Sequence, residues 1–433
     1  MKRFSLISPS VRQVYYGWWV LAAVFTLGLM SGGIFSFSNG IFFGPIKDDL
    51  LLTSAQTSLI FALARAEGSI AGPIVGRLVD KFGARSMIIG GGILASLGFM
   101  LLHWIDDYWV FVIIFVGIVS TGKSAGLGQT LLSAVNRWFI KRRALAMSIC
   151  ITGFSSGGAV LLPLITIGVH TIGWRDVMLY SGLFMLIIII PLGRVVRHSP
   201  ESMGLEPDGE ASDSNQSSNT TDSRSLSINI PHDFLVREAL KTKEYWILLV
   251  GSVMRITLWG ATSVHGVEMM VWHGMSREGA GFMFSLMFLL SIPTRLIAGY
   301  FGDKVPLQPL LCTGMIAAAM GCISLLLVNG DIGVLAFVIL MAVEQGCSTL
   351  NWVALGNYFG RRSFATLMGI MSTCFNFGML VSPIYAGVMF DRSHSYTVVL
   401  LTFIPIYVVS GIFFLISKRP ESPLEIKTRY RCS

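Results

Sequence analysis

The sequence GRLVDKFGAR at residues 76–85 has a partial copy, GYFGDK, at residues 299–304. The two copies share the pattern Gly-x-x-x-Asp-Lys and begin 223 residues apart, and each closes the second long apolar segment of its half of the chain. Either copy alone could arise by chance. A repeat at this distance indicates a duplicated bundle of membrane helices, so we expect two similar halves.

The composition agrees with this interpretation. The chain is 53% hydrophobic and 13% charged, whereas soluble domains are roughly a quarter charged. Apolar segments of about 20 residues recur along almost the whole length, and each is long enough to cross about 30 Å of hydrocarbon. We therefore predict an all-α membrane protein with twelve transmembrane helices in two six-helix bundles.

One polar stretch divides the apolar segments. The predicted order is an N-terminal arm (1–15), a first bundle (16–194), a central loop (195–244), a second bundle (245–417) and a tail (418–433). Residues 211–225 of the loop are almost entirely Ser, Asn, Asp, Thr and Gln, which cannot bury a core, so we expect disorder there. The sequence FLVREAL at 234–240 predicts a short amphipathic helix at the membrane surface.

The basic residues predict the orientation. If both termini are cytoplasmic, 24 of the 32 Lys and Arg residues lie in cytoplasmic segments and four lie on the other side. This asymmetry satisfies the positive-inside rule. We therefore attribute the net charge of +8 to topology and not to nucleic-acid binding. We expect a multi-pass protein of the plasma membrane with both termini in the cytoplasm.

A second repeat supports parallel halves. The sequence NRWF at 136–139, followed by Arg142 and Arg143, matches NYF at 357–359, followed by Arg361 and Arg362. Both copies lie between the fourth and fifth apolar segments of their half. The agreement in order and direction indicates two halves of six helices each.

Together these features resemble the major facilitator superfamily over residues 15–417. Three motifs are similar to its monocarboxylate porter and oxalate/formate antiporter branch: YGWW at 16–19, NRWF at 136–139 and GWR at 173–175. The resemblance implies alternating access and secondary transport of a small organic anion, with a monocarboxylate as the expected substrate. Proton cotransport and anion exchange both remain open as the mode of coupling.

The resemblance also gives the repeated turn a role. In that superfamily the Asp of the first turn pairs with basic residues and with a helix terminus in one conformation, which implies that Asp80, Lys81 and Arg85 close the cytoplasmic ends of the bundles. The alternative is ordinary positive-inside charge around a tight turn. Asp303 is the equivalent in the second turn, where Val305 and Pro306 replace the Gly and Arg region, so we expect a weaker contact there.

Ionisable residues near mid-membrane are costly and are therefore functional candidates. Counting from the ends of the apolar segments places six there: Arg65, Glu67, Lys123, Arg255, Arg295 and Glu344. Four are positive and two are negative. The surplus of two positive charges has no fixed partner within the set, and an anionic substrate would supply one.

Arg295 is the predicted substrate anchor. It lies four residues before Gly299, where the resemblance places the arginine that binds the carboxylate, and a guanidinium holds a carboxylate through two parallel hydrogen bonds. The alternatives are that Arg295 extends toward the cytoplasm or pairs with Glu344. Two departures weaken the analogy for proton coupling. Those porters carry a polar or acidic residue four positions before the arginine, where this chain has only Ser291. They also carry a lysine in the first apolar segment, and this chain has no counterpart of that lysine.

Further residues complete the prediction. Arg255, Lys123 and Asn376 are the other expected substrate-binding residues. Glu67 and Glu344 compete as the proton-coupling group, and each has the alternative of a structural counter-ion. His265 could sense external pH or serve as a hydrogen-bonded helix histidine.

The remaining patterns exclude other classes. The six cysteines form no C-x-x-C pair, and the sequence has neither a nucleotide-binding loop nor a nucleophile constellation, so we expect no metal, no cofactor and no enzymatic activity. The expected partners are the substrate anion, protons and the lipid bilayer, and the fold is expected to work as a monomer. Two rival hypotheses are an exporter of amphiphilic compounds and a membrane sensor that binds solute without transport.

Overall fold

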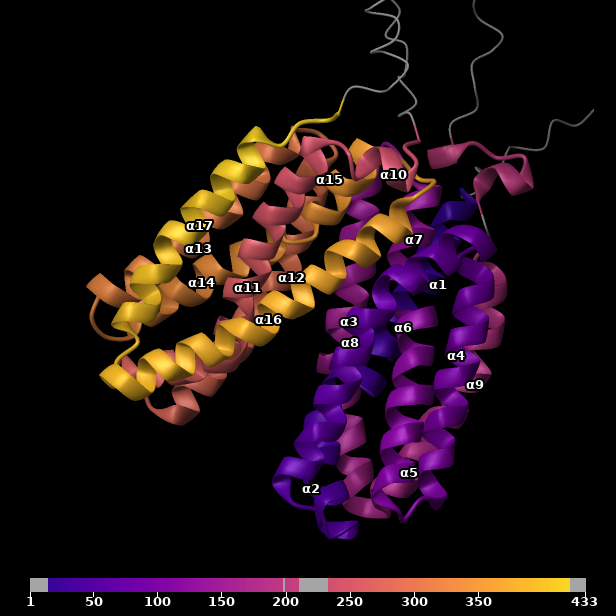
Figure 1. The fold of residues 1–433 in the computed structure, drawn as a ribbon, viewed down its shortest axis with the longest axis horizontal. Helices are drawn as coiled ribbons and strands as arrows, with labels where there is room; N and C mark the ends of the chain where they lie inside the picture. The colour runs from indigo at the N-terminus through magenta and orange to yellow at the C-terminus, as the bar shows by residue number, and fades with distance from the viewer. Residues whose placement is uncertain (1–14, 198, 210–232, 421–433) are drawn as a thin grey trace, which may run out of the picture.

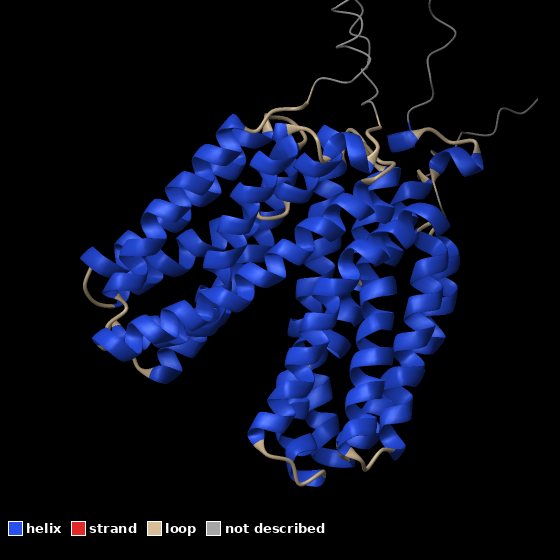
Figure 2. Ribbon diagram, viewed as in Figure 1, coloured by secondary structure: helices blue, strands red, loops and turns tan. Residues whose placement is uncertain are grey.

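The computed structural model describes residues 15–197, 199–209 and 233–420. Every regular element in these ranges is helical, and Figure 2 shows no strand among them. The segment predicted to be disordered, 211–225, lies outside the described residues, as do most of the N-terminal arm and of the tail.

The first bundle spans residues 16–195 in six passes. Two passes each contain a π-helical segment between α-helical parts. The first pass comprises α1 (Tyr16–Met30), η1 (Ser31–Phe37) and α2 (Asn39–Asp49), and the fourth comprises α5 (Tyr108–Val112), η3 (Ile113–Ser120), α6 (Thr121–Leu127) and α7 (Gln129–Trp138). The others are α3 (Ser54–Phe82), α4 (Ala84–Leu101) continued by η2 (Leu102–Trp104), α8 (Arg143–Ile172) and α9 (Trp174–Val195).

The second bundle begins at Lys243 and ends at Ile416. Its helices are α11 (Lys243–Trp272), α12 (Arg277–Gly302), α13 (Leu307–Leu327), α14 (Asp331–Cys347), α15 (Leu350–Phe359), α16 (Phe364–Ser393) and α17 (Thr397–Ile416). Between the bundles lie the short helical turns η4 (Pro200–Met203) and η5 (Pro207–Gly209) and the single turn α10 (Val236–Ala239), which falls inside the amphipathic helix predicted at 234–240.

The number of membrane passes agrees with the prediction. Among the described residues, eleven helical stretches are long and apolar enough to cross a membrane. The twelfth is α3, whose parts Gln56–Gly68 and Ile70–Phe82 meet at 43° and pass the same test together. Arg65 and Glu67 lower the hydropathy of this helix. The first pass extends from Tyr16 to Asp49, because α2 continues it beyond the π-helical segment.

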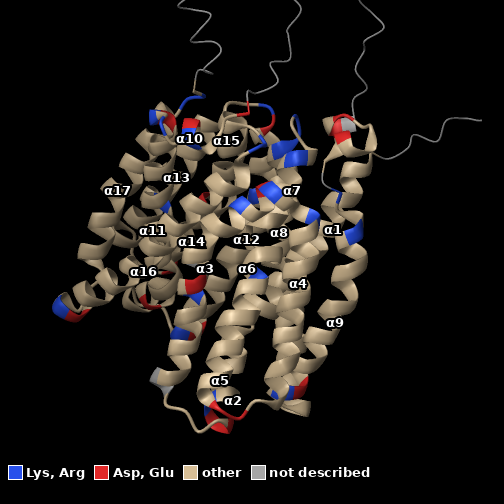
Figure 3. Ribbon diagram, turned by 45° about the vertical axis from the view of Figure 1, so that its right-hand side comes forward, with Lys and Arg blue, Asp and Glu red and all other residues tan. Residues whose placement is uncertain are grey.

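The two bundles meet at one end of the molecule and diverge toward the other (Figure 1). The contact is made by α3 against α16 and by α8 against α12. We call the end where the bundles meet the basic end, because Lys and Arg gather there around α7, α10 and α15 (Figure 3). The opposite end is called the far end.

The repeated turn explains the close approach at the basic end. A Cβ added to Gly76 would lie 2.3 Å from the carbonyl oxygen of Ala365 in α16, and one added to Gly299 would lie 2.4 Å from Oγ of Ser148 in α8. Both distances are too short for any side chain. The first glycine of each copy therefore lets the two bundles touch, and the aspartate four residues later reaches across the same seam.

Candidate functional site

Two of the four basic residues predicted to lie near mid-membrane belong to the second bundle, and one of these two forms an ion pair. Nη1 of Arg255 in α11 lies 2.8 Å from Oε1 of Glu344 in α14, with side chains 6% and 0% exposed. The second carboxylate oxygen accepts a 2.8 Å hydrogen bond from Nε2 of Gln345. A buried ion pair needs this degree of satisfaction to persist in a low dielectric. Glu344 is therefore placed as the counter-ion of Arg255.

Arg295 points across the seam between the bundles. Its Nη1 donates a 2.9 Å hydrogen bond to Oγ of Ser155, which belongs to α8 of the first bundle. The side chain is buried, and its Nε has no hydrogen-bond partner in the described part of the chain. It lies within electrostatic range of both Glu344 and Arg255, but Glu344 is hydrogen-bonded to Arg255. Arg295 thus makes no ion pair in this arrangement.

The first bundle holds an equivalent set of charges. Glu67 in α3 accepts hydrogen bonds from Oγ of Ser120 at 2.8 Å and of Ser124 at 3.2 Å. Lys123 is half-buried and lies within electrostatic range of Glu67 and Arg65. Arg65 is exposed, whereas Glu67 is half-buried. Of the six residues predicted to lie at mid-depth, each bundle therefore carries two cations and one carboxylate, so the surplus within this set is one positive charge per bundle.

The other predicted residues are placed as follows. His265 in α11 is held at both ring nitrogens, with Nδ1 3.0 Å from the Tyr396 hydroxyl and Nε2 3.0 Å from the Pro383 carbonyl oxygen. The carbonyl can only accept, so Nε2 carries the proton. Asn376 in α16 is half-buried and makes no hydrogen bond to another described residue. His265 is thus tied to its own bundle.

The two turn aspartates make equivalent contacts at the basic end. Oδ2 of Asp80 accepts from the backbone N–H of Thr366 at 2.9 Å and from its hydroxyl at 2.6 Å, at the start of α16. Asp303 accepts from the backbone N–H groups of Ala144 at 2.7 Å and Leu145 at 3.0 Å, at the start of α8. Each carboxylate thus meets the positive end of a helix in the opposite bundle. The second contact has as many hydrogen bonds as the first, although the sequence predicts a weaker one.

The basic members of the first turn are placed differently from the aspartate. Nζ of Lys81 lies 5.2 Å from the ring centroid of Phe82, its neighbour in sequence. Among the described residues, neither Lys81 nor Arg85 makes an ion pair across the bundles. The basic residue that faces Asp80 is Arg137 of the second repeat, with Nη2 3.9 Å from Oδ1.

Burial changes the acidity of the second turn. Burial raises the pKa of Asp303 to about 6, and the nearby negative charge of Asp208 acts in the same direction. The hydrogen bonds from Leu145 and Ala144 and the charge of Arg143 oppose this rise. The carboxyl group of Asp303 is therefore positioned to take up a proton under mildly acidic conditions.

The second repeat also joins the bundles. Nη1 of Arg143 donates to Oδ1 of Asn357 at 2.7 Å, and Nη1 of Arg361 donates to the carbonyl oxygen of Arg137 at 2.9 Å. Both bonds connect one copy of the motif to the other. The sequence identified these residues as a repeat, and the structure places the two copies in contact.

Two further carboxylates were missed by sequence reasoning. Asp208 accepts from the backbone N–H groups of Ile140 at 2.8 Å and Lys141 at 2.7 Å, and Asp233 accepts from that of Arg361 at 2.6 Å. These acceptors flank the central segment and bind equivalent loops of the two halves. The sequence does show that the two loops are repeats of each other. That repeat predicts two similar sets of backbone N–H donors, but it does not predict that Asp208 and Asp233 accept from them.

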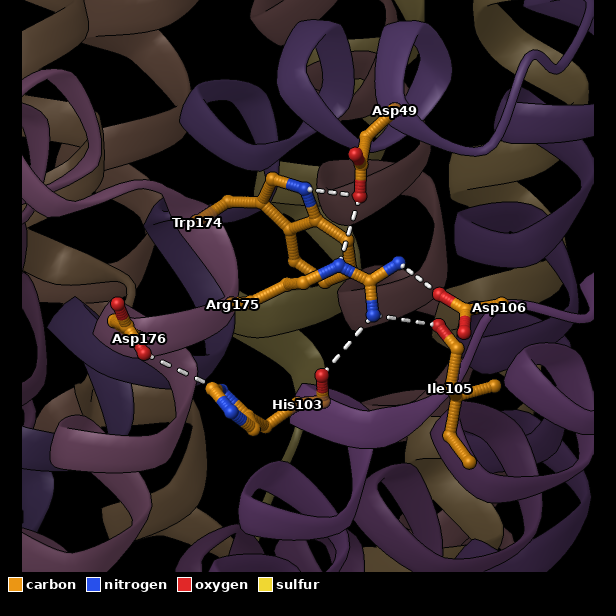
Figure 4. Close-up of polar contacts among 7 residues, drawn as sticks. All are labelled: Asp49, His103, Ile105, Asp106, Trp174, Arg175 and Asp176. Atoms are coloured by element: carbon orange, nitrogen blue, oxygen red, sulfur yellow. Dashed lines mark hydrogen bonds and ion pairs between the residues drawn. The ribbon is translucent and has the colours of Figure 1, made fainter.

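The GWR motif at 173–175 forms a cluster at the far end within the first bundle (Figure 4). Arg175 pairs with Asp49 at 2.8 Å and Asp106 at 2.7 Å, and it donates to the carbonyl oxygens of His103 and Ile105. This cluster ties the ends of three passes together. It lies away from the mid-depth charges, and its arrangement is that of a structural brace.

Comparison with known proteins identifies the architecture. The sequence model described as Major Facilitator Superfamily matches residues 21–342 and, in a second match, 247–430. The structure is similar to the transporter FucP in the outward conformation, with a TM-score of 0.67, 16% identity, and coverage of 94% of this chain and 100% of that one. It is also similar to the proton:xylose symporter XylE, with a TM-score of 0.70, 14% identity, and coverage of 96% and 99%.

Relatives with curated names are more informative about function. Mouse monocarboxylate transporter 11 is 24% identical over 92% of this chain and 86% of its own length. Human monocarboxylate transporter 11 is 32% identical over 40% of this chain, and that match spans only 36% of the human protein. The oxalate:formate antiporter of Oxalobacter formigenes is 26% identical over 53% of this chain and 50% of its own length.

Proposed function

This chain belongs to the major facilitator superfamily, and on that premise we propose that it is a secondary active transporter of a small organic anion, with a monocarboxylate as its substrate. The observation that carries the proposal is the state of Arg295. Its guanidinium is buried between the bundles and hydrogen-bonded to Ser155, while the neighbouring carboxylate of Glu344 is hydrogen-bonded to Arg255. A buried cation without an ion-pair partner favours an anionic ligand.

The distribution of charge supports the same conclusion. Each bundle has a surplus of one positive charge among the residues predicted at mid-depth, and these charges would attract an anion that passes between the bundles. Asn376 could supply a further hydrogen bond to such an anion. The names of the relatives, monocarboxylate transporters and an oxalate:formate antiporter, agree with this substrate class.

For the coupling group we propose Glu67. Both oxygens of Glu344 already accept short hydrogen bonds, and both ring nitrogens of His265 are occupied. Glu67 is only half-buried and is held by two hydroxyl groups, which can turn to accept or donate when the carboxyl group changes its protonation state. Anion exchange without a proton remains the alternative mode.

We further propose that the basic end faces the cytoplasm and that the protein lies in the plasma membrane. The positive-inside rule supports this orientation, since the loops of both repeats and the central segment carry most of the basic residues. In the arrangement seen here, the bundles meet at the basic end and diverge at the far end, which corresponds to access from outside the cell.

The test is uptake of radiolabelled lactate, pyruvate, formate and oxalate into proteoliposomes, with and without an inward proton gradient. Gradient-driven uptake that Arg295→Ala abolishes would support proton-coupled transport, and stimulation by an internal anion in place of the gradient would indicate exchange. An exporter of amphiphiles would instead move uncharged or cationic compounds, and a sensor would bind a carboxylate without flux. Absence of both uptake and binding of every acid would refute the proposal.

A further inference from the structure

One face of α8 lies against the helix that carries Arg295. Ser148, Thr152 and Ser155 are spaced four and three residues apart, so they share one side of the helix. Ser155 bonds to Arg295, and Ser148 lies against Gly299, one turn further along α12. The opposite side of α8, with Gly153 and Gly157, packs against the first pass. The three hydroxyl groups therefore face the second bundle.

Hydrogen bonding at Arg295 leaves one edge of the guanidinium free. Nη1 is occupied by Ser155, whereas Nε is buried and has no partner in the described part of the chain. Nη2 likewise forms no hydrogen bond to a described residue. Nε and Nη2 lie on the same side of the planar group and together form the fork that binds a carboxylate side-on through two parallel hydrogen bonds. Ser155 thus holds the guanidinium by the one nitrogen that such binding does not need.

From this geometry we propose that Ser155 is a positioning residue for the substrate carboxylate. By accepting from Nη1, it presents the Nε and Nη2 edge of Arg295 to a single planar carboxylate. Because Ser155 and Arg295 belong to different bundles, the fork is held only while the bundles meet at the basic end. Opening that end separates the two residues and weakens the site, which favours release there. The inference rests on the proposed function and deepens it.

Two neighbouring hydroxyl groups support a role beyond packing. Ser148 is fully buried and Thr152 is 7% exposed, and neither hydroxyl has a hydrogen-bond partner in the described residues. Such unsatisfied groups destabilise a packed helix face, so a purely structural seam would favour alanine at both positions. Both lie toward the basic end from Ser155.

The test compares Ser155→Ala with Ser155→Thr, using the acid that the wild-type protein transports best. A hydroxyl that orients a charged donor contributes about a tenfold change in affinity, so Ser155→Ala should raise KM for uptake from the far end about tenfold. Maximal velocity should stay within about twofold of wild type, and Ser155→Thr should restore KM. Ser86→Ala is the matched control, because its hydroxyl donates to the carbonyl oxygen of Phe82 at the end of α3 and does not contact Arg295.

Carboxylate-induced thermal stabilisation of the purified protein gives a second readout that does not depend on flux. The acid concentration needed for half-maximal stabilisation should rise in Ser155→Ala by the same factor as KM. Ser155→Cys provides the same comparison with a poor acceptor if the alanine variant does not fold. Normal uptake by the wild type with an unchanged KM in Ser155→Ala would overturn this inference alone. Neither uptake nor stabilisation in the wild type would overturn the proposed function and this inference with it.

Discussion

Substitution of Asp80 by asparagine tests how the basic end is held closed. The carboxylate accepts two hydrogen bonds from Thr366, the third residue of α16, and it lies 3.9 Å from Arg137. Asparagine keeps the shape of the side chain but removes its charge. The change therefore weakens the contact between the bundles and leaves each bundle intact.

The size of the effect follows from the contacts. A hydrogen bond to a charged group contributes about 1.5–3 kcal/mol and a neutral one about 0.5–1.5 kcal/mol, so each of the two bonds loses about 1 kcal/mol. Removing the negative charge from the start of α16 costs about 0.3–1 kcal/mol more. The sum of about 2–3 kcal/mol corresponds to a shift of about 30- to 150-fold toward the state that is open at the basic end.

The assay is a distance measurement between spin labels at the far end, one in each bundle. Leu51 and His394 are exposed there and can carry the labels in a background without the native cysteines. Because rocking of the bundles opens one end and closes the other, Asp80→Asn should increase the population with a short distance between the labels.

One control variant calibrates this result. Asp107→Asn removes a carboxylate that caps α5 within the first bundle, where it accepts from the N–H of Val110 at 2.9 Å, and should change nothing. Distances in Asp80→Asn that match the wild type would refute the assignment of this carboxylate to closure.

Three more predictions follow from the same contacts. Burial raises the pKa of Asp303 to about 6 in the state that is closed at the basic end, whereas a solvated aspartate titrates near 4. The closed state therefore binds this proton more tightly than the open state. Lowering the pH at the basic end from 7 toward 5 should increase the population of the closed state in the spin-label assay, and Asp303→Asn should show no such effect. Glu344→Gln removes one partner of a buried ion pair and should destabilise the protein by about 3–5 kcal/mol, which would appear as a large fall in the unfolding temperature. Glu67→Gln should leave the unfolding temperature nearly unchanged and should abolish the stimulation of uptake by a proton gradient. Asp233→Ala leaves the N–H of Arg361 without its acceptor and should increase the population open at the basic end, whereas equal distances in this variant and the wild type would show that the central segment does not hold the loops.

Much of the architecture could be predicted from the sequence because hydrocarbon thickness and backbone hydrogen bonding restrict membrane helices so strongly. The repeated turn predicted two halves, and the structure explains its glycine and its aspartate through the close approach and the hydrogen bond that each one makes. The extent of the first pass could not be predicted from apolar patterning, because α2 contains Pro45 and ends with the charged residues Lys47, Asp48 and Asp49.

The site was less predictable. Counting charges identified the mid-membrane residues, but it could not decide whether Glu344 pairs with Arg255 or with Arg295, because that depends on the rotation of three helices. The partner of Arg295 is a serine on the other bundle, and nothing in the sequence distinguishes Ser155 from the many other serines. Asp208 and Asp233 were missed because their partners are backbone N–H groups, which carry no side-chain signature.

The most direct test of the account compares two arginine variants in proteoliposomes. Arg277→Ala removes an arginine that is 72% exposed and pairs with Glu268 at the surface, whereas Arg295→Ala removes the buried guanidinium held by Ser155. We predict that initial uptake of the preferred carboxylate is lost in Arg295→Ala and retained in Arg277→Ala. Equal uptake by folded preparations of both variants and the wild type would contradict the central claim that Arg295 binds the transported anion.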